Sequence, residues 1–235
     1  LISASPKLIT TFFDKEEVKF VFNEYVQLDD IDKQLIISPP LRIGGYKLHP
    51  TMSASKKITL SILDTLLENT TYTFNFREGI KDYNEGNKMS FFSYTISTGA
   101  EIDSLNLKGL IKDAIEMEPD DFISLQLYPI DSSFNDSAIY RKKPFYVTST
   151  LDSTVFEFKN LKAGKYELIA LKDFSNNYYF DQNVDQIGFL NTPITLPLDS
   201  IIELKIFKEK TIFSWADPFF INNHHIGCLL YTSPS

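Results

Sequence analysis

The chain of 235 residues has a formal net charge of −8 at pH 7, and 43% of its residues are hydrophobic. This length allows one large domain or two domains of about 100 residues each, and no run of about 18 apolar residues is present to span a membrane. Most of the negative charge lies in residues 100–235, and an acidic surface without a basic stripe argues against binding to nucleic acid or to anionic membranes.

The first 99 residues alternate between apolar and polar side chains, a pattern typical of half-buried strands. In the run from Glu17 to Val26, the side chains of Val18, Phe20 and Phe22 share one face, which we expect to point into a core. The other predicted strands of this half cover 56–63, 70–76 and 91–98. Turn signals separate these strands, at Pro39-Pro40, Gly44-Gly45, Glu68-Asn69 and 84–87. The pattern predicts an antiparallel β-sandwich.

Two turns of this half carry more detailed expectations. Tyr72 enters its strand directly after a polar turn, so we expect its hydroxyl to bond back to that turn, as in a tyrosine corner. The segment from Asp82 to Asn87 places Gly86 where a tight turn needs a left-handed residue. Its Asp82, Asn84 and Glu85 also offer oxygen atoms to a cation, and a simple turn between strands is the competing interpretation.

A second set of strands begins at Leu105, after Gly99 and a polar stretch. The predicted strands of this half cover 105–111, 122–129, 143–149, 154–161, 164–172, 192–198 and 201–207. We therefore divide the chain into a first sandwich over 1–99, a linker over 100–105, a second sandwich over 106–209 and a tail over 210–235. The fold class that follows is all-β, with two antiparallel β-sandwiches in tandem.

The second half also contains a predicted hairpin and one weak helical signal. Phe156 and Phe158 precede a turn at 162–164, and Gly164 permits a positive φ there, which favours a hairpin between 154–161 and 164–172. A helix is suggested only around 110–121, where Pro119 and the surrounding strand pattern weaken it.

The segment 171–189 is the best candidate for a metal site. Calcium prefers oxygen ligands at alternating positions of a tight loop, and Asp173, Ser175 and Asn177 supply three of them. The pattern departs from an EF-hand loop because Tyr178 stands where a glycine is usual and Val184 stands at the twelfth position. The predicted calcium ligands are Asp173, Asn177, Asp181 and Asp185. The competing interpretation is an Asx-rich loop whose side chains accept bonds from backbone groups.

The sequence favours binding or structural roles over catalysis. It contains no G-x-S-x-G, P-loop or H-E-x-x-H motif, so we assign no catalytic residue and, apart from calcium, no cofactor. Tyr178, Tyr179 and Phe180 could stack on sugar rings, and loop packing is the alternative. Other envelope proteins and surface glycans are the partners that remain.

The first half resembles the bacterial Ig-like domain of the S-layer type. The resemblance is carried by Phe22-Asn23-Glu24, Pro39-Pro40, 67–74 and 82–87. The second half resembles the transthyretin-like or carboxypeptidase-regulatory sandwich, through the pattern F-x-F-x-N-L-x-x-G-x-Y-x-L-x-A at 156–170. The pair is similar to uncharacterised Ig-like proteins of the Bacteroidetes envelope. The resemblance implies an extracytoplasmic protein, secreted or lipid-anchored, and no particular activity. We therefore expect a non-catalytic structural, adhesion or binding module of a bacterial envelope protein, and the alternative is an accessory carbohydrate-binding module of a larger surface enzyme.

The tail contains an apparent metal cluster of His224, His225 and Cys228. The last eight residues, CLLYTSPS at 228–235, match a translated sequencing adapter, so we expect the natural sequence of this piece to stop at about Gly227. Without Cys228 the cluster loses its thiol, and two adjacent histidines on a strand point to opposite faces. The tail therefore predicts no metal site.

Overall fold

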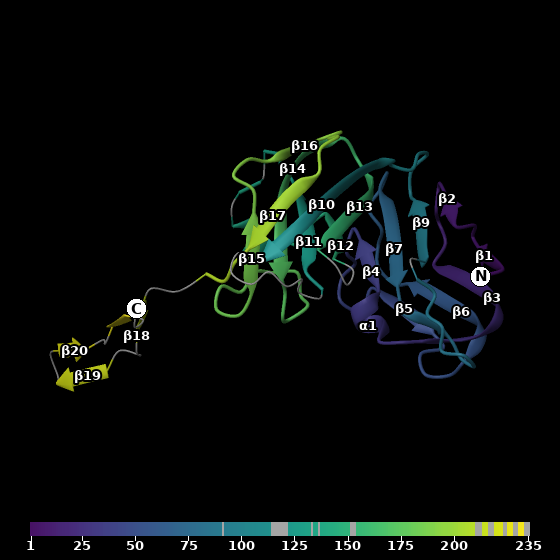
Figure 1. Cartoon of the computed structure of the whole chain (residues 1–235), viewed down its shortest axis with the longest axis horizontal. Helices are drawn as coiled ribbons and strands as arrows, with labels where there is room; N and C mark the ends of the chain where they lie inside the picture. Colours follow the sequence, from purple (N-terminus) through teal and green to yellow (C-terminus); the bar gives the residue numbers. More distant parts are fainter. Residues whose placement is uncertain are drawn as a thin grey trace.

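The computed structural model of the chain describes residues 1–90, 92–113, 122–132, 134–135, 137–150, 154–209, 213–215, 219–222, 225–227 and 230–232. The protein is all-β, with two bodies of strands side by side and a tail that extends away from them (Figure 1). Within the described residues, no helix is long and apolar enough to cross a membrane.

The first body is a sandwich of two sheets. One sheet has the order β1-β3-β6-β5, with β8 also paired to β3, and the other has the order β2-β9-β7-β4. The first sheet comprises β1 (Ser3–Ser5), β3 (Glu17–Leu28), β5 (Tyr46–His49), β6 (Ser55–Ile62) and β8 (Ile80–Asp82). The second comprises β2 (Ile9–Thr10), β4 (Ile36–Ser38), β7 (Thr71–Arg77) and β9 (Phe92–Ser97), and a short α1 (Ile31–Gln34) precedes β4.

Aromatic side chains from both sheets fill the core of this sandwich. Phe20 of β3 is fully buried, and its ring meets those of Phe76, Phe92 and Tyr94 edge-on, at centroid distances of 5.6, 5.3 and 5.3 Å. Edge-to-face pairs are a favourable arrangement of aromatic rings. The predicted alternation along β3 is confirmed, because Val18, Phe20 and Phe22 are buried and the residues between them are exposed.

The second body is also built from two sheets. One has the order β13-β10-β17 and the other the order β12-β11-β14-β15, with β16 also paired to β14. The first comprises β10 (Leu105–Asp113), β13 (Val155–Leu161) and β17 (Ile202–Ile206). The second comprises β11 (Ser124–Pro129), β12 (Tyr146–Ser149), β14 (Gly164–Lys172), β15 (Gln186–Phe189) and β16 (Ile194–Leu196). A short α2 (Ala138–Arg141) follows β11, and the inward residues of the two sheets form a core separate from the first.

Two local predictions for the first sandwich are confirmed. The hydroxyl of Tyr72 accepts a hydrogen bond from the backbone N–H of Leu67 at 2.9 Å, so it closes the preceding turn as expected. In the turn after β8, Gly86 has a φ of +76°, and Asp82 Oδ1 accepts bonds from the N–H groups of Asn84 and Glu85 at 2.8 and 2.6 Å.

The predicted hairpin between 154–161 and 164–172 is wrong. β13 pairs with β10, whereas β14 pairs with β11, β15 and β16, so the turn at 162–164 carries the chain from one sheet to the other. The positive φ of this region belongs to Asn160, at 59°, and not to Gly164. Phe156, Phe158 and Tyr166 still point inward as the alternation predicts, because the two strands face each other across the core.

Other departures from the sequence pattern are small. Two strand pairs are parallel, β2 with β9 and β10 with β17, while the other pairs of named strands are antiparallel. The helical signal around 110–121 overlaps the end of β10 at Asp113, and 114–121 lie outside the described residues. The four residues of β15 lie at the end of the segment that the sequence analysis interprets as a loop. So short a strand leaves no clear alternation in the sequence.

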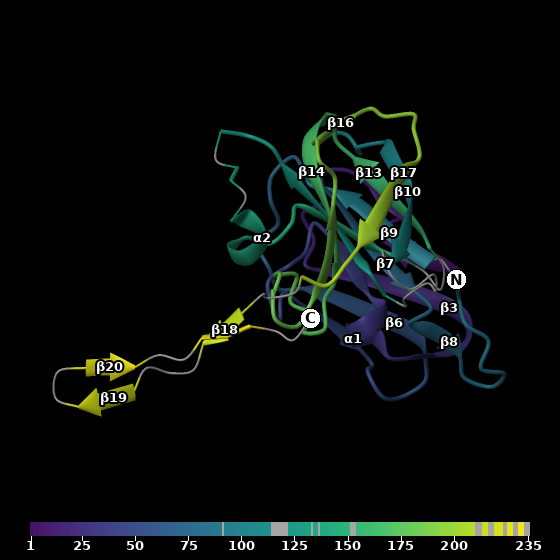
Figure 2. The same cartoon turned by 60° about the vertical axis from the view of Figure 1, so that its left-hand side comes forward.

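The tail forms two short antiparallel pairs beyond the sandwiches (Figure 2). β18 (Phe213–Trp215) pairs with β21 (Leu230–Thr232), and β19 (Phe219–Asn222) pairs with β20 (His225–Gly227). Of the residues singled out in the sequence, His225 lies in β20, while His224 and Cys228 are outside the described part of the chain.

Candidate functional site

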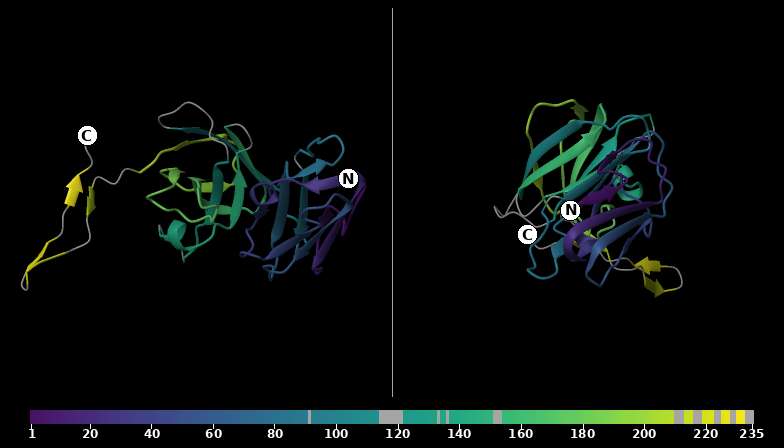
Figure 3. Two further views of the ribbon diagram at one scale, coloured as in Figure 1. Left: turned by 90° about the horizontal axis from the view of Figure 1, so that it is seen from below. Right: turned by 90° about the vertical axis from the view of Figure 1, so that its right-hand side faces the viewer.

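The two sandwiches meet along an edge of one sheet from each. They lie next to each other, with β4 and β7 of the first beside β12 and β13 of the second (Figure 1), and the view from below shows the same arrangement of the two bodies (Figure 3). β4 and β12 are each the last strand in their sheet. Ser38 of β4 accepts a hydrogen bond at its Oγ from the backbone N–H of Val147 in β12, at 3.0 Å. Each strand therefore covers the other's open edge, where unpaired backbone groups would otherwise be exposed.

A buried arginine crosses this boundary. Arg77, at the end of β7, is 3% exposed and adopts a positive φ of 45°. Its Nε donates to the carbonyl oxygen of Gln34 at 2.8 Å, Nη2 donates to the carbonyl oxygen of Lys33, and Nη1 donates to Ser149 Oγ of the second sandwich at 2.8 Å. The guanidinium also lies 4.8 Å from the ring centre of Phe122, a residue of the second sandwich. One rigid cation thus contacts both bodies.

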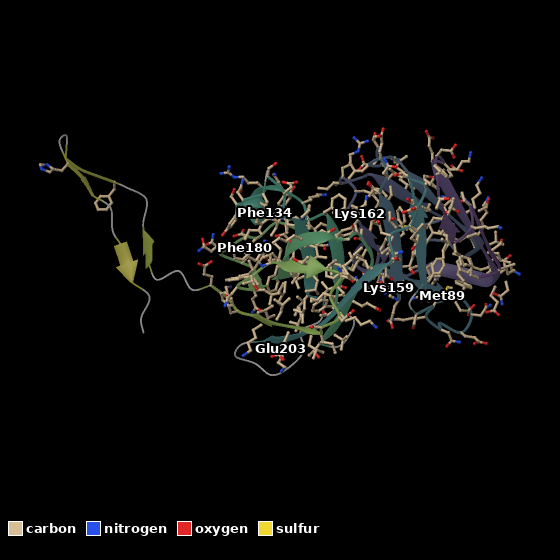
Figure 4. All side chains as sticks on the ribbon, turned by 90° about the horizontal axis from the view of Figure 1, so that it is seen from above. Met89, Phe134, Lys159, Lys162, Phe180 and Glu203 are labelled. Atoms are coloured by element: carbon tan, nitrogen blue, oxygen red, sulfur yellow. The ribbon has the colours of Figure 1, made fainter. Side chains whose placement is uncertain are left out.

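Further hydrogen bonds connect the first sandwich, the linker and the second sandwich. They run from Lys143 Nζ to Leu41 O (3.1 Å), from Lys162 Nζ to Asn69 O (3.3 Å), from Asp103 N to Thr71 Oγ1 (3.0 Å) and from Asn160 Nδ2 to Asp103 O (3.2 Å). Figure 4 shows Lys162 and Lys159 on the side of the second sandwich that faces the first. The bonds are spread along the boundary, so they restrain rotation as well as separation.

A cleft opens between the two bodies at one end of this boundary. A cavity of about 830 Å³ is lined by residues 32–46 of the first sandwich and by Lys143 and 175–179 of the second. A smaller cavity of about 280 Å³ adjoins it, shares Asp32, Leu35, Asn176 and Tyr178 with it, and reaches Arg77. Cavities of about 300–1,000 Å³ are the usual size of ligand sites in proteins.

Three tyrosines line this cleft. Tyr46 belongs to the first sandwich, Tyr178 and Tyr179 to the second, and all three are half-buried. Burial is the main reason that the pKa of Tyr178 is raised, and the Asp173 carboxylate and Tyr46 raise it further while Arg77 opposes them. Burial also raises the pKa of Tyr46, with a contribution from Asp32. The hydroxyls of Tyr46 and Tyr178 therefore remain protonated at neutral pH and act as neutral donors and acceptors.

The structure brings the predicted metal residues into one loop, with most of their oxygens directed at backbone groups. Asp185 is 1% exposed, and its two carboxylate oxygens accept from the N–H groups of Phe174 (3.1 Å) and Asp181 (2.8 Å). Asp181 Oδ1 accepts from the N–H of Asn183 at 3.0 Å. These carboxylates therefore bind backbone N–H groups of their own loop and hold its two ends together.

Asn177 and Asp173 play similar parts on the cleft side of the loop. Asn177 Oδ1 accepts from Tyr179 N at 2.7 Å, and Asp173 Oδ2 accepts from Tyr178 N at 2.6 Å. Among the described residues, Asp173 Oδ1 is buried without a hydrogen-bond partner. Burial raises the pKa of the Asp173 carboxyl, and nearby Asp185 adds to the effect, whereas the Tyr178 N–H opposes it.

The calcium hypothesis for Asp173, Asn177, Asp181 and Asp185 stays a prediction. Within the described part of the chain, no three His, Cys, Asp or Glu side chains are grouped as a metal ion requires. The competing interpretation is that these side chains accept hydrogen bonds from backbone N–H groups, and the structure contains such bonds.

The three aromatic residues proposed for stacking on sugars do not act as one surface. Tyr178 and Tyr179 line the cleft, whereas Phe180 is 6% exposed and packs beside Phe134 in a small apolar cluster next to α2. Figure 4 shows Phe134 and Phe180 together on the side of the second sandwich away from the first. Phe180 is therefore a core residue.

No pattern in the sequence points to the residues that join the two bodies. Arg77 looks like the polar end of an ordinary strand, and Ser38 and Ser149 look like exposed strand residues. Tyr46 also carries no signal, because Tyr178 and Tyr179, the other tyrosines of the cleft, lie more than a hundred residues away in the sequence.

Comparisons with known proteins concern mainly the first sandwich. A family model described as "Bacterial Ig-like domain" matches residues 1–98, which confirms the bacterial Ig-like resemblance of the first half. No curated protein matches the chain. The transthyretin-like resemblance of the second half stays a prediction.

Several solved structures of bacterial surface proteins show a distant likeness. The major pilin subunit BcpA of Bacillus cereus is 10% identical, with 88% of this chain and 69% of the pilin covered and a TM-score of 0.28. The N-terminal part of the bacterial S-layer protein SbsC is 15% identical, with 89% and 43% covered and a TM-score of 0.25. The pilus adhesin RrgA from Streptococcus pneumoniae is 11% identical, with 93% and 32% covered and a TM-score of 0.25. At these scores the likeness carries no argument about function.

Proposed function

We propose that this chain is a non-catalytic, extracytoplasmic structural module of a bacterial surface protein, in which two β-sandwiches are held in a fixed orientation. Such a unit serves as a spacer or as a rigid platform for adhesion. The match of residues 1–98 to the bacterial Ig-like domain supports the surface location. The observation that carries the proposal is Arg77, which bonds to backbone oxygens of its own sandwich and to Ser149 of the other.

The chemistry of the boundary favours a rigid unit. Hydrogen bonds that involve a charged group contribute roughly 1.5–3 kcal/mol each, and the planar guanidinium fixes direction as well as distance. The bond from Val147 N to Ser38 Oγ pairs a backbone group that an edge strand would otherwise leave open. A hinged pair of domains would give up these contacts at each opening.

The rotational motion of the two sandwiches tests the proposal. We expect backbone ¹⁵N relaxation to give one shared correlation time for 1–98 and 105–206 in the unaltered protein. Arg77→Met keeps the apolar stem but removes the donors, so we expect shorter and separate correlation times for the two bodies. Lys57→Met, at an exposed position of β6, is the matched control and should leave the shared value unchanged.

Two results would contradict the proposal. Independent tumbling of the sandwiches in the unaltered protein would remove the rigid unit itself. A shared correlation time that persists in Arg77→Met would show that Arg77 is not the contact that holds the orientation.

A further inference from the structure

We propose that the cleft between the two sandwiches is a glycan-binding site, in which hexopyranose rings lie against Tyr46, Tyr178 and Tyr179. This inference rests on the proposed rigid unit, because the walls of the cleft come from both bodies. It adds a ligand to a module that is otherwise only mechanical.

The shape of the cleft fits a short stretch of sugar rings. The wider cavity of about 830 Å³ falls in the upper part of the usual range for ligand sites. It adjoins the smaller cavity of about 280 Å³ at Tyr178, so one sugar ring can occupy the smaller cavity while its neighbours lie in the wider one. An extended polymer needs such an open-ended site.

The lining combines aromatic rings with neutral polar groups. A pyranose ring has an apolar face of C–H groups and a rim of hydroxyls, and a tyrosine offers an apolar ring with a hydroxyl at its end. Ser175, Asn176 and Asn177 border the three tyrosines, and Asn177 is held in place by its bond to Tyr179 N. Amide and hydroxyl groups both donate and accept hydrogen bonds, which suits sugar hydroxyls.

The charges beside the cleft favour a neutral glycan over an acidic one. Arg42 is paired with Asp64, at 3.3 Å between Nε and Oδ1, and also donates to the carbonyl oxygen of Leu63. Lys143 donates to the carbonyl oxygen of Leu41, and Asp32 adds a negative charge to the lining. No single sign of charge dominates among these described residues.

The loop that carries Tyr178 and Tyr179 is fixed in an unusual conformation. Asn176 and Tyr178 have positive φ values of 51° and 67°, and a bulky residue rarely adopts this region. The bond from Tyr178 N to Asp173 Oδ2, at 2.6 Å, holds the turn that places the ring in the cleft. Because this loop is already ordered, it loses little conformational entropy when a ligand binds.

Affinity electrophoresis of the full chain tests the inference. The gels contain one soluble polysaccharide each: yeast mannan, barley β-glucan, starch, glycol chitin or polygalacturonate. We expect retardation by at least one of the first four, at a strength that persists in high salt. Tyr179→Ala and Tyr46→Ala should each weaken the apparent affinity about tenfold, whereas Tyr179→Phe should retain it because the ring remains. Tyr83→Ala, at an exposed tyrosine outside the cleft, is the matched control.

Three outcomes would overturn the inference. They are migration unchanged in every gel, retardation only by polygalacturonate that salt abolishes, and retardation that Tyr179→Ala and Tyr46→Ala leave unaltered. The proposal of a rigid unit is tested separately, by backbone ¹⁵N relaxation of the same protein. A shared correlation time together with unchanged migration rejects the glycan alone, and independent tumbling rejects the proposed module itself.

Discussion

Two ionisable side chains near the boundary, Arg77 and Asp173, are stabilised to different degrees. Arg77 is buried among carbonyl oxygens and a serine hydroxyl, which accept bonds from its guanidinium. Asp173 accepts from Tyr178 N with one oxygen, while its other oxygen is buried without a partner in the described structure. A buried carboxylate with an unpaired oxygen opposes folding, because ionisation is costly away from water.

Asp173→Asn should raise the midpoint of thermal unfolding at neutral pH. Burial raises the pKa of Asp173 in the folded state, so folding disfavours the ionised form once the pH exceeds the ordinary value of about 3.9. Below that value the carboxyl is protonated in both states and the penalty is absent. The gain should therefore be present at about pH 7 and fade toward about pH 3, as measured by circular dichroism melts across this range.

A matched variant separates charge from packing. Asp181→Asn removes a carboxylate from an exposed position of the same loop and should change the midpoint little at either pH. A loss of stability at neutral pH in Asp173→Asn would show that the carboxylate supports the native loop, contrary to the prediction.

Residues that act through near neighbours were predictable from the sequence, and residues that act across the molecule were not. The role of Tyr72 follows from a turn five residues earlier, and that of Gly86 from its own backbone. Arg77 acquires its role from Ser149 and Phe122, which only the arrangement of the two sandwiches brings near.

Strands and their pairing also differ in how far the sequence predicts them. The strands themselves follow from local patterns, whereas their partners do not. Alternation predicted the long strands β3, β6, β7, β13 and β14, because each buries one face on a core. It failed for the partner of β14, since residues that alternate inward look the same in a hairpin and in two strands that face each other across a sandwich. Very short elements such as β15 and α1 bury too few residues to leave a periodic signal.

The loop between β14 and β15 gives a clear test of the calcium hypothesis. A calcium site at Asp173, Asn177, Asp181 and Asp185 requires a higher melting midpoint in calcium than in EGTA. We expect equal midpoints instead, because a cation would have to displace the N–H groups that Asp185 binds at 3.1 and 2.8 Å. Asp185→Asn should lower the midpoint in both buffers, by about 1–3 kcal/mol in the free energy of unfolding, through loss of a buried acceptor.

The opposite result has a definite meaning. A rise in calcium that disappears in Asp185→Asn would establish the predicted cation site. Magnesium at the same concentration is the control, because it keeps more of its water and fits such a loop poorly.

On the scale of the whole molecule, the edge strands explain how the two bodies form one unit. β4 and β12 each end a sheet, and each lies against the other rather than against solvent. The polar groups that meet between β4 and β12 are a short side chain and a backbone N–H, so the fit depends on the register of two strands that are more than a hundred residues apart. No pattern within either half specifies such a contact.

Ser38→Ala should loosen this contact while leaving both cores intact. It removes the acceptor of the Val147 N–H, and Val147 is only 4% exposed, so the donor remains without a partner. Leaving a buried N–H unpaired costs about 1–3 kcal/mol, and separation of the two edges relieves part of that cost by admitting water. We therefore expect faster hydrogen exchange at Val147, measured by NMR, with exchange at Leu60 and Ala170 unchanged because these residues lie within the separate cores.

Ser38→Thr keeps a hydroxyl and should restore protection, and Ser61→Ala on β6 should have no effect at Val147. Exchange at Val147 that is as slow in Ser38→Ala as in the unaltered protein would mean that packing alone holds the two edges together.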